Sequence, residues 1–246
     1  MSVIDAHGHL GGWFNFPIPD GSAASLLQIM DRCGVEAACV SHLLAVGPDA
    51  RAGNALLVEE LARHPGRLLG YAVYQPHDPQ AGARLRELLD VPGMIGVKLH
   101  PETHHTALDS PAYDEAFTIA AERGVLVLAH GEYGSRWSDP ARFAAVAPRH
   151  PSVPLLMGHC GLWPEGFAAA ARAAHAAPNL VLETCGSKMT ARHLVRLVRE
   201  VGAERVAFGS DAVFLDLRVG LGRVRLADLT EAERTQILYG TMKGLL

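Results

Sequence analysis

The chain has 246 residues and a mass of 26.3 kDa, with 49% hydrophobic and 20% charged residues, values that exclude a disordered or collagen-like protein. Its formal net charge of -4 argues against nucleic-acid binding, because nucleic-acid-binding proteins need a basic face. No apolar run approaches the roughly 20 residues of a membrane span, and the amino end MSVIDAHGHL lacks the basic segment and long apolar stretch of a signal peptide.

Short apolar runs typical of β-strands alternate with longer segments of helical spacing. The predicted strands are 3–7, 37–43, 68–74, 95–99, 125–129, 153–158, 180–183 and 205–209. The predicted helices lie near 23–33, 51–63, 79–89, 111–122, 138–149, 164–176, 189–202 and 227–245. This alternation predicts a parallel sheet. Eight strand–helix units in about 250 residues match a (β/α)8 barrel, so we expect residues 1–246 to form a single α/β domain, a TIM barrel that carries the catalytic site.

The alternative architecture is an open, doubly wound parallel sheet. That fold leads one to expect a glycine-rich phosphate-binding turn after the first strand. Here the first strand runs into Asp5-Ala6-His7-Gly8-His9, and the sequence contains neither G-x-G-x-x-G nor G-x-x-x-x-G-K-[ST]. The barrel is therefore the preferred interpretation.

Polar residues collect at the carboxyl ends of six of the eight predicted strands. They are His7, His9, Lys98, His100, His130, His159, Glu183 and Asp211. In a barrel these ends meet at one rim, where barrel enzymes place their chemistry. Because charged groups and imidazoles are costly to bury without partners, their repeated appearance at one rim indicates a functional site.

His7 and His9 lie two residues apart, so in an extended strand both side chains leave the same face, and Asp5 has the same parity. His130 and Asp211 could complete a set of ligands for one metal ion. Imidazole nitrogen and carboxylate oxygen suit zinc, and a catalytic zinc keeps one position open for water. The bound water would have its pKa lowered towards about 7. The alternative is a set of buried, hydrogen-bonded histidines with a helix-capping aspartate.

The four cysteines are Cys33, Cys39, Cys160 and Cys185, and none belongs to a C-x-x-C pair. Their density is too low for a disulfide scaffold. We expect reduced thiols in a cytoplasmic protein. Cys160 and Cys185 follow predicted strands, and a small buried thiol is the default expectation for each.

The residues at these strand ends resemble those of the amidohydrolase superfamily. The matching segments are IDAHGH at 4–9, GVKLHP at 96–101, AHG at 129–131, MGHCG at 157–161 and FGSD at 208–211. The sequence is most similar to the amidohydrolase-related (amidohydrolase 2) branch that includes aminocarboxymuconate-semialdehyde decarboxylase. The resemblance covers nearly the whole chain in the same order.

The resemblance implies a role for each matching residue. His7, His9, His130 and Asp211 correspond to the ligands of one divalent metal ion, usually zinc. His159 corresponds to the catalytic histidine that handles the proton of metal-bound water, and Asp211 also takes part in that proton transfer. The chain departs from the pattern at Thr241, where relatives carry Asn. It is also short, which leaves little room for a capping domain and favours an open site or a lid supplied by a neighbouring subunit of a homo-oligomer.

Lys98 has three interpretations. A carboxylated lysine on strand four bridges two metals in other amidohydrolases, which would make the site binuclear. Alternatively, Lys98 binds a substrate carboxylate, or it forms a structural ion pair with Glu183. His100 shares its parity and could contact a second metal, contact the substrate or line the wall. His104 and His105 lie in a predicted loop beside Glu102, where we expect them to be solvated.

Loops after strands provide specificity in barrels. Trp13 follows the first strand and Arg136 the fifth, so they could wall an organic substrate and hold its anionic group. Alternatively, the tryptophans in these loops pack at a subunit interface.

Three functions are compatible with these residues. The first is a metal-dependent hydrolase in which activated water attacks an amide, ester or lactone carbonyl of a small molecule. The second is a metal-dependent non-oxidative decarboxylase of a small carboxylic acid. The third is a metal-binding barrel without catalysis, which predicts no open ligand position and no cleft. In the two enzymatic hypotheses the expected partner is a small molecule carrying a carboxylate.

Overall fold

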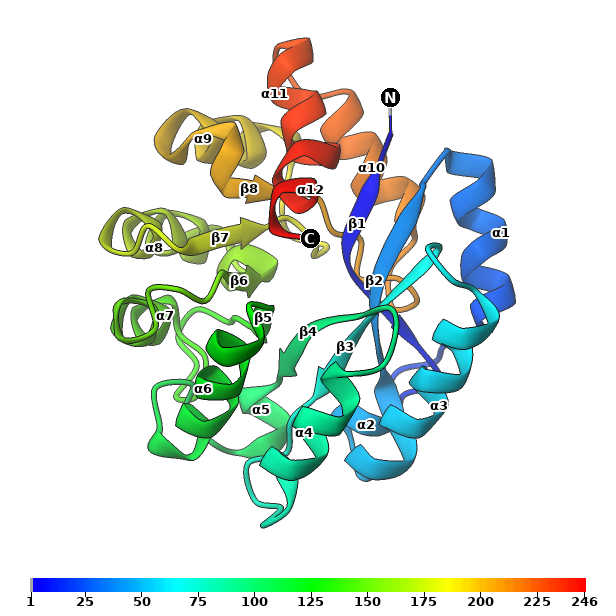
Figure 1. Ribbon diagram of the computed structural model, residues 1–246. Helices are drawn as coiled ribbons and strands as arrows, with labels where there is room; N and C mark the ends of the chain where they lie inside the picture. The colour runs from blue at the N-terminus through cyan, green and yellow to red at the C-terminus, as the bar shows by residue number, and fades with distance from the viewer. Residues whose placement is uncertain (1) are drawn as a thin grey trace.

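In the computed structural model, which describes residues 2–246, parallel strands stand in sequence order around one axis (Figure 1). The strands are β1 (Ile4–Leu10), β2 (Ala37–His42), β3 (Leu68–Val73), β4 (Met94–Leu99), β5 (Leu126–His130), β6 (Leu155–Gly158), β7 (Leu180–Glu183) and β8 (Val206–Ala207). The predicted order of eight strands is confirmed, and the fold is a TIM barrel.

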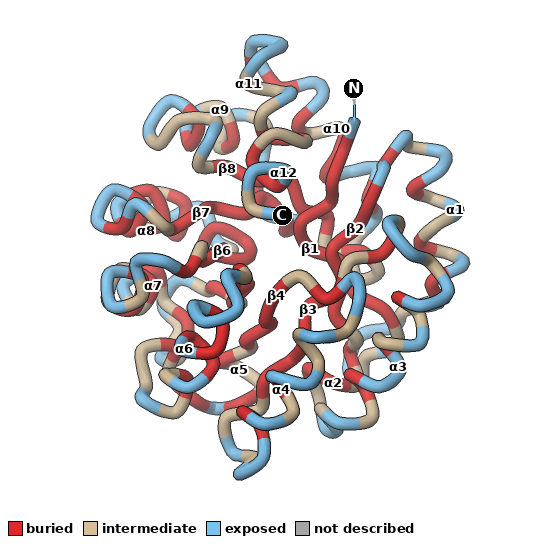
Figure 2. Tube along the Cα trace, viewed as in Figure 1, coloured by how far each residue is buried: buried red, intermediate tan, exposed pale blue. Residues whose placement is uncertain are grey.

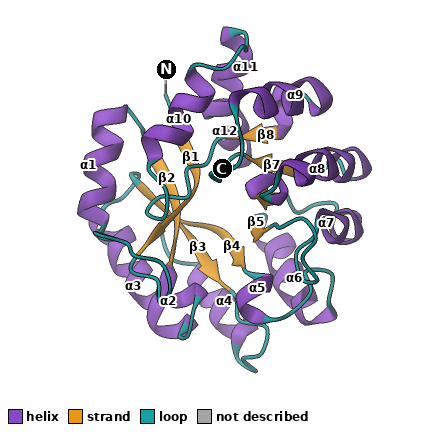
Figure 3. Ribbon diagram, turned by 180° about the vertical axis from the view of Figure 1, so that it is seen from behind, coloured by secondary structure: helices purple, strands orange, loops and turns teal. Residues whose placement is uncertain are grey.

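Helices surround the strands on the outside of the barrel (Figure 3). They are α1 (Ala23–Cys33), α2 (Leu43–Val46), α3 (Ala50–Arg63), α4 (Ala81–Leu89), α5 (Pro101–His104), α6 (Asp114–Arg123), α7 (Pro140–Val146), α8 (Pro164–Ala176), α9 (Ala191–Val201), α10 (Leu217–Arg225), α11 (Glu231–Thr235) and α12 (Thr241–Leu245). Within residues 2–246, no helix combines the length and the apolarity that crossing a bilayer requires.

The barrel closes where the segment after β8 meets β1. The amide of Ala6 donates to the carbonyl of Phe208 at 2.8 Å, and the amide of Asp211 donates to the carbonyl of His7 at 2.8 Å. Gly8 also pairs with Ala212. The residues that follow the short strand β8 therefore continue its pairing with β1, and Asp211 is held beside the histidines of β1.

Apolar side chains form two main core clusters. Figure 2 shows that the strands are the most continuously buried part of the chain. The larger cluster lies between the strands and the outer helices. The smaller one fills the barrel interior and consists of Ile4, Ala6, Cys39, Tyr71, Leu126, Leu128, Leu156, Val181, Ala207 and Met242. Because Met242 belongs to α12, the last helix closes the amino-terminal end of the barrel. The polar strand ends are thus confined to the opposite end.

Four helices differ from the sequence-based prediction. The four-residue helices α2 and α5 begin where His42 and His100 accept a hydrogen bond from a backbone amide in the first turn, a capping role that the sequence does not announce. Helix α10 lies in a segment where no helix is predicted from the sequence. Its residues Gly220 and Gly222 lower the helical propensity of that segment. The predicted final helix 227–245 begins only at Glu231, after the capping box of Thr230.

Asn54 joins α3 to the carboxyl half of β3. Its side chain donates to the carbonyl of Val73 at 2.9 Å and accepts from the amide of Val73 at 3.0 Å. Only 5% of Asn54 is exposed, so the amide satisfies two backbone groups that water does not reach. This contact fixes the helix against the strand near the carboxyl end of the barrel.

His104 is buried, so the expectation that it is solvated is wrong, whereas His105 is exposed as predicted. The Nδ1 atom of His104 lies 2.9 Å from the hydroxyl of Tyr113. Burial lowers the pKa of His104 to about 4. The short helix α5 turns this histidine inward, which the loop predicted for this segment did not anticipate.

Replacing Asn54 by Ala should lower the free energy of unfolding by about 1–3 kcal/mol, because both groups of Val73 lose their buried partner. Chemical denaturation measures this difference. Asn15→Ala is the matched control, since Asn15 is exposed. Equal stabilities of the two variants would contradict the bridging role.

His104 should make the fold sensitive to acid. Its pKa in the folded protein is about 4, below the ordinary value of 6.5, so at intermediate pH the unfolded chain binds a proton that the folded chain does not. The unfolding free energy should therefore fall as the pH drops from about 6.5 to 4, by up to about 3 kcal/mol for this group. His104→Gln should flatten that part of the stability profile and His105→Gln should not.

Candidate metal centre

A cavity of about 310 Å³ opens at the carboxyl ends of the strands. Its ionisable lining residues are His7, His9, Lys98, His100, His130, His159 and Asp211. These residues come from β1, β4, β5 and the segments after β4, β6 and β8, so the predicted convergence of strand ends is present. The hypothesis of a metal-binding barrel without catalysis predicts no cleft, so this open cavity argues against it.

A β-bulge in β1 decides which side chains enter the cavity. The pairing of β1 with β2 shifts between Asp5 and Gly8, so strict alternation is broken there. His7 and His9 both line the cavity, but Asp5 does not. The expectation that Asp5 shares their face is therefore wrong, because one extra residue changes the parity of the strand.

Asp5 instead forms hydrogen bonds with Ser210, in the loop that carries Asp211. One oxygen of Asp5 accepts from the amide of His7 at 3.1 Å and from the amide of Ser210 at 2.9 Å, and the other accepts from the Ser210 hydroxyl. Burial raises the pKa of Asp5 to about 7, although these hydrogen bonds act in the opposite direction. Asp5 is thus a positioning residue behind the cavity.

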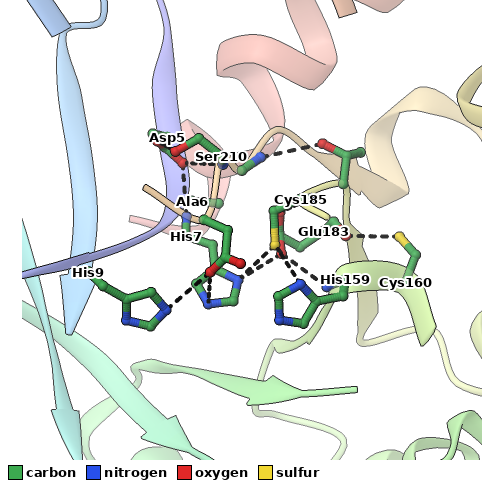
Figure 4. A network of polar contacts seen from close by, with 12 residues as sticks. Asp5, Ala6, His7, His9, His159, Cys160, Glu183, Cys185 and Ser210 are labelled. Atoms are coloured by element: carbon green, nitrogen blue, oxygen red, sulfur yellow. Dashed lines mark hydrogen bonds and ion pairs between the residues drawn. The ribbon is translucent and has the colours of Figure 1, made fainter. Parts of the chain in front are cut away.

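His7 is oriented by Glu183 at the end of β7 (Figure 4). The Nδ1 atom of His7 lies 2.9 Å from Oε2 of Glu183. Glu183 is fully buried, and it also accepts from the amides of His159 and Cys185. Burial raises the pKa of Glu183 and lowers that of His7. A Nδ1–H donated to a carboxylate leaves the lone pair of Nε2 free for a metal ion.

The space for this carboxylate depends on Gly209. A Cβ atom at Gly209 would lie 2.0 Å from Oε1 of Glu183. The glycine in the segment FGSD therefore makes room for the group that orients His7.

His9 and Asp211 face each other across the cavity. Nε2 of His9 lies 3.3 Å from Oδ1 of Asp211, and Nδ1 of His9 lies 3.0 Å from the hydroxyl of Ser41. Burial lowers the pKa of His9. Burial alone would raise the pKa of Asp211, but the hydrogen bond with His9 and the nearby basic groups outweigh burial and lower it. Asp211 is therefore an anionic carboxylate beside neutral imidazoles.

His159 and Asp211 both have left-handed backbones, with φ of 64° and 61°. Such conformations are unusual outside glycine and concentrate at functional sites. Nδ1 of His159 lies 3.0 Å from the sulfur of Cys185, and burial lowers the pKa of His159 to about 3. His159 is thus a neutral imidazole at neutral pH, able to accept a proton.

His130 and His100 form the adjoining wall. Their rings stack with centroids 4.4 Å apart, and the His130 ring lies 4.7 Å from that of His159. The Nδ1 atom of His100 accepts from the amide of Thr103 at 3.3 Å. This donation leaves the proton of a neutral His100 on Nε2, where it can be donated to a ligand.

The donor set fits a divalent metal ion. Oδ1 of Asp211 lies 3.3 Å from Nε2 of His9 and 4.0 Å from Nε2 of His7. Ligands bound at 2.0–2.2 Å to a tetrahedral ion are about 3.3 Å apart, which matches the distance between Asp211 and His9 and is shorter than the distance between Asp211 and His7. The donor atoms of His7, His159, Cys185 and Asp211 lie within 4.8 Å of one another, and this grouping includes neither His9 nor His130.

Lys98 is buried, with its Nζ atom 2.8 Å from Nε2 of His7. Among residues 2–246, no carboxylate oxygen lies within 4.0 Å of this ammonium, so the structural ion pair with Glu183 is absent. Burial lowers the pKa of Lys98 to about 8. The strand-four lysine therefore points at Nε2 of His7.

Aromatic side chains wall the outer part of the cavity. Trp13 lines it as expected, together with Phe16 and Phe214, whose rings are 5.4 Å apart. Arg136 does not line the cavity, because its guanidinium stacks 4.3 Å from the ring centre of Trp137 on the exposed rim. The structure therefore does not bring Arg136 to the site.

Two residues at the site were not assigned a role from the sequence. Cys185 follows β7 at the same parity as Glu183 and touches both His7 and His159, at 3.2 and 3.0 Å. Phe214 follows Asp211 by three residues. In each case the only signal in the sequence is the distance along the chain from a predicted site residue.

Comparisons with known proteins agree with this geometry. The family model described as amidohydrolase matches residues 4–241. The gamma-resorcylate decarboxylase of Rhodococcus jostii is 24% identical over 241 aligned positions, covering 76% of this chain and 73% of that protein. A dihydroxybenzoic acid decarboxylase of Polaromonas sp. JS666, solved with manganese and 2-nitroresorcinol, superposes with a TM-score of 0.77 at 17% identity, covering 99% and 96% of the two chains.

A structural neighbour with another described activity is equally similar. It is a protein of Acinetobacter baumannii described as a probable 2-pyrone-4,6-dicarboxylic acid hydrolase, solved with citric acid. The two chains superpose with a TM-score of 0.76 at 15% identity, and 100% of this chain and 99% of the other are covered.

Glu183→Gln should weaken divalent-metal binding about 10–100-fold, because removing the carboxylate that orients a metal-binding histidine has effects of this size. Chelator competition followed by elemental analysis measures the change. Glu36→Gln is the control, since Glu36 is exposed. Unchanged metal affinity in Glu183→Gln would contradict the orienting role of the carboxylate.

Proposed function

The chain belongs to the amidohydrolase family and is an enzyme of that superfamily, and from this premise we propose that it is a metal-dependent decarboxylase of a small aromatic carboxylic acid. The observation that carries this proposal is a buried cation, Lys98, beside a cluster of metal-ligand side chains inside an aromatic-walled cavity. A relative whose name is gamma-resorcylate decarboxylase supports the same reaction class.

The cavity favours a planar substrate with one negative end. Lys98 and the Nε2–H of His100 offer hydrogen bonds to a carboxylate at its inner part. Phe16, Leu162 and Phe214 offer apolar contacts further out. A cavity of about 310 Å³ lies at the small end of the usual range for ligand sites, which suits a molecule with one ring.

The proposed ligands of the metal ion are His7, His9, His130 and Asp211. The ion would supply positive charge to oxygen atoms of the substrate as negative charge develops on them. Nitrogen and oxygen donors are compatible with zinc and with manganese, so zinc stays a prediction from the sequence.

Proton transfer is assigned to His159 and Asp211. When the bond to the carboxylate carbon breaks, carbon dioxide leaves and the remaining carbon must gain a proton. His159 would take a proton from solvent water and deliver it to that carbon. Because burial lowers the pKa of His159 to about 3, its protonated form is short-lived and gives the proton up readily. Asp211, an anion at the same cavity, stabilises the protonated form of His159 while it exists.

Hydrolysis of a lactone, ester or amide is the second candidate function. The neutral His159 and the anionic Asp211 are also suited to remove a proton from water. The structural neighbour described as a pyrone dicarboxylic acid hydrolase favours this alternative. Both candidates take a substrate with a carboxylate, and they differ in whether carbon dioxide is a product.

A panel of hydroxybenzoates should release carbon dioxide, and His159→Asn should lower that turnover about 10²–10⁴-fold with unchanged metal content. Removing the metal with a chelator should abolish turnover, and adding it back should restore it. His175→Asn is the control, since His175 is exposed on α8.

Two results would count against this proposal. Full turnover of metal-depleted protein would remove the metal from the reaction. Hydrolysis of lactones or esters without carbon dioxide release from any acid would favour the second candidate.

A further inference from the structure

The contact between Lys98 and His7 involves the one lone pair that a metal ion would need. Nδ1 of His7 faces Glu183 at 2.9 Å, so the lone pair of His7 is on Nε2. Nζ of Lys98 lies 2.8 Å from that Nε2 atom and donates to it. An imidazole nitrogen has one lone pair, so it serves either the ammonium or a metal ion.

The surroundings of Lys98 offer its ammonium little else. The residue is 1% exposed, and its Nζ atom has no hydrogen-bond partner other than His7 among the described residues. Asp211 and Glu183 face the ammonium from a greater distance, beyond 4.0 Å. A buried cation with no adjacent anion is costly unless a ligand supplies one.

We propose that Lys98 is an internal substitute for the metal ion: its ammonium occupies the lone pair of His7 until a metal ion displaces it, and the displaced ammonium then anchors the carboxylate of the substrate. The second half of this inference rests on the proposed function, and the first half does not. The metal ion therefore binds before the substrate, because the ammonium of Lys98 becomes available to the substrate only after the metal ion has bound to His7.

The proposal makes a prediction opposite to that of a metal-bridging lysine. If Lys98 competes with the metal, removing its charge raises metal affinity. If Lys98 instead contributes a ligand atom, removing it lowers metal affinity. A lysine with neither role leaves the affinity unchanged.

The test titrates the zinc-loaded chain of 246 residues with a chelator of known affinity and measures the zinc retained. Lys98→Met should hold zinc about tenfold more tightly or better, because a hydrogen bond from a charged group no longer competes. Lys98→Gln should do the same, and thermal unfolding checks that each variant folds. Lys243→Met is the control, since Lys243 is exposed on α12.

The anchoring role is tested by calorimetry on the zinc-loaded proteins with benzoate and its uncharged analogue benzamide. The wild type should prefer benzoate, and Lys98→Met should lose about tenfold in benzoate affinity with little change for benzamide. Unchanged or weaker zinc binding in both Lys98 variants would overturn the competition. Equal loss of both ligands, or loss of neither, would overturn the anchoring. Because the zinc titration involves no turnover, it fails or succeeds independently of the reaction proposed above.

Discussion

The hydrogen bond between Glu183 and His7 is the constraint on which the site depends. It is formed between β7 and β1, strands that are neighbours of the short strand β8, and it lies wholly in the interior. A carboxyl group buried there needs hydrogen-bond donors, and Glu183 receives them from His7, His159 and Cys185. Gly209 leaves the room for it. The orientation of His7, and with it the direction in which a metal ion is offered a lone pair, follows from this one carboxylate.

The electrostatics of the cavity favour neutral imidazoles around few charges. Burial lowers the pKa of His7, His9, His100 and His159, so these rings are acceptors or donors but not cations. The remaining charges are the carboxylate of Asp211 and the ammonium of Lys98. A divalent cation would contact the carboxylate of Asp211 and a substrate carboxylate would contact the ammonium of Lys98, so each bound charge would meet a group of opposite sign.

The order of the strands and the rim on which the polar residues meet could be predicted from the sequence. The reason is that the carboxyl ends of all strands in a parallel barrel lie at the same end of the barrel. The sequence was insufficient where one residue changes the geometry. The bulge in β1 moves Asp5 off the face of His7 and His9. Loop conformation decided that Phe214 enters the cavity and Arg136 does not. Cys185 and His104 became notable only through contacts between distant segments.

The closure of the barrel and the metal centre are the same part of the molecule. Strand β8 has two residues, and the segment after it reaches β1 through backbone hydrogen bonds beside Asp211. His7 and His9 lie on one side of this seam and Asp211 on the other. An ion bound by all three would connect β1 to the segment after β8. The ion would then stabilise the folded protein in addition to its role in the reaction. The thermal stability of the protein, and the resistance of its two ends to proteases, would then increase with the fraction of protein that has bound the metal ion.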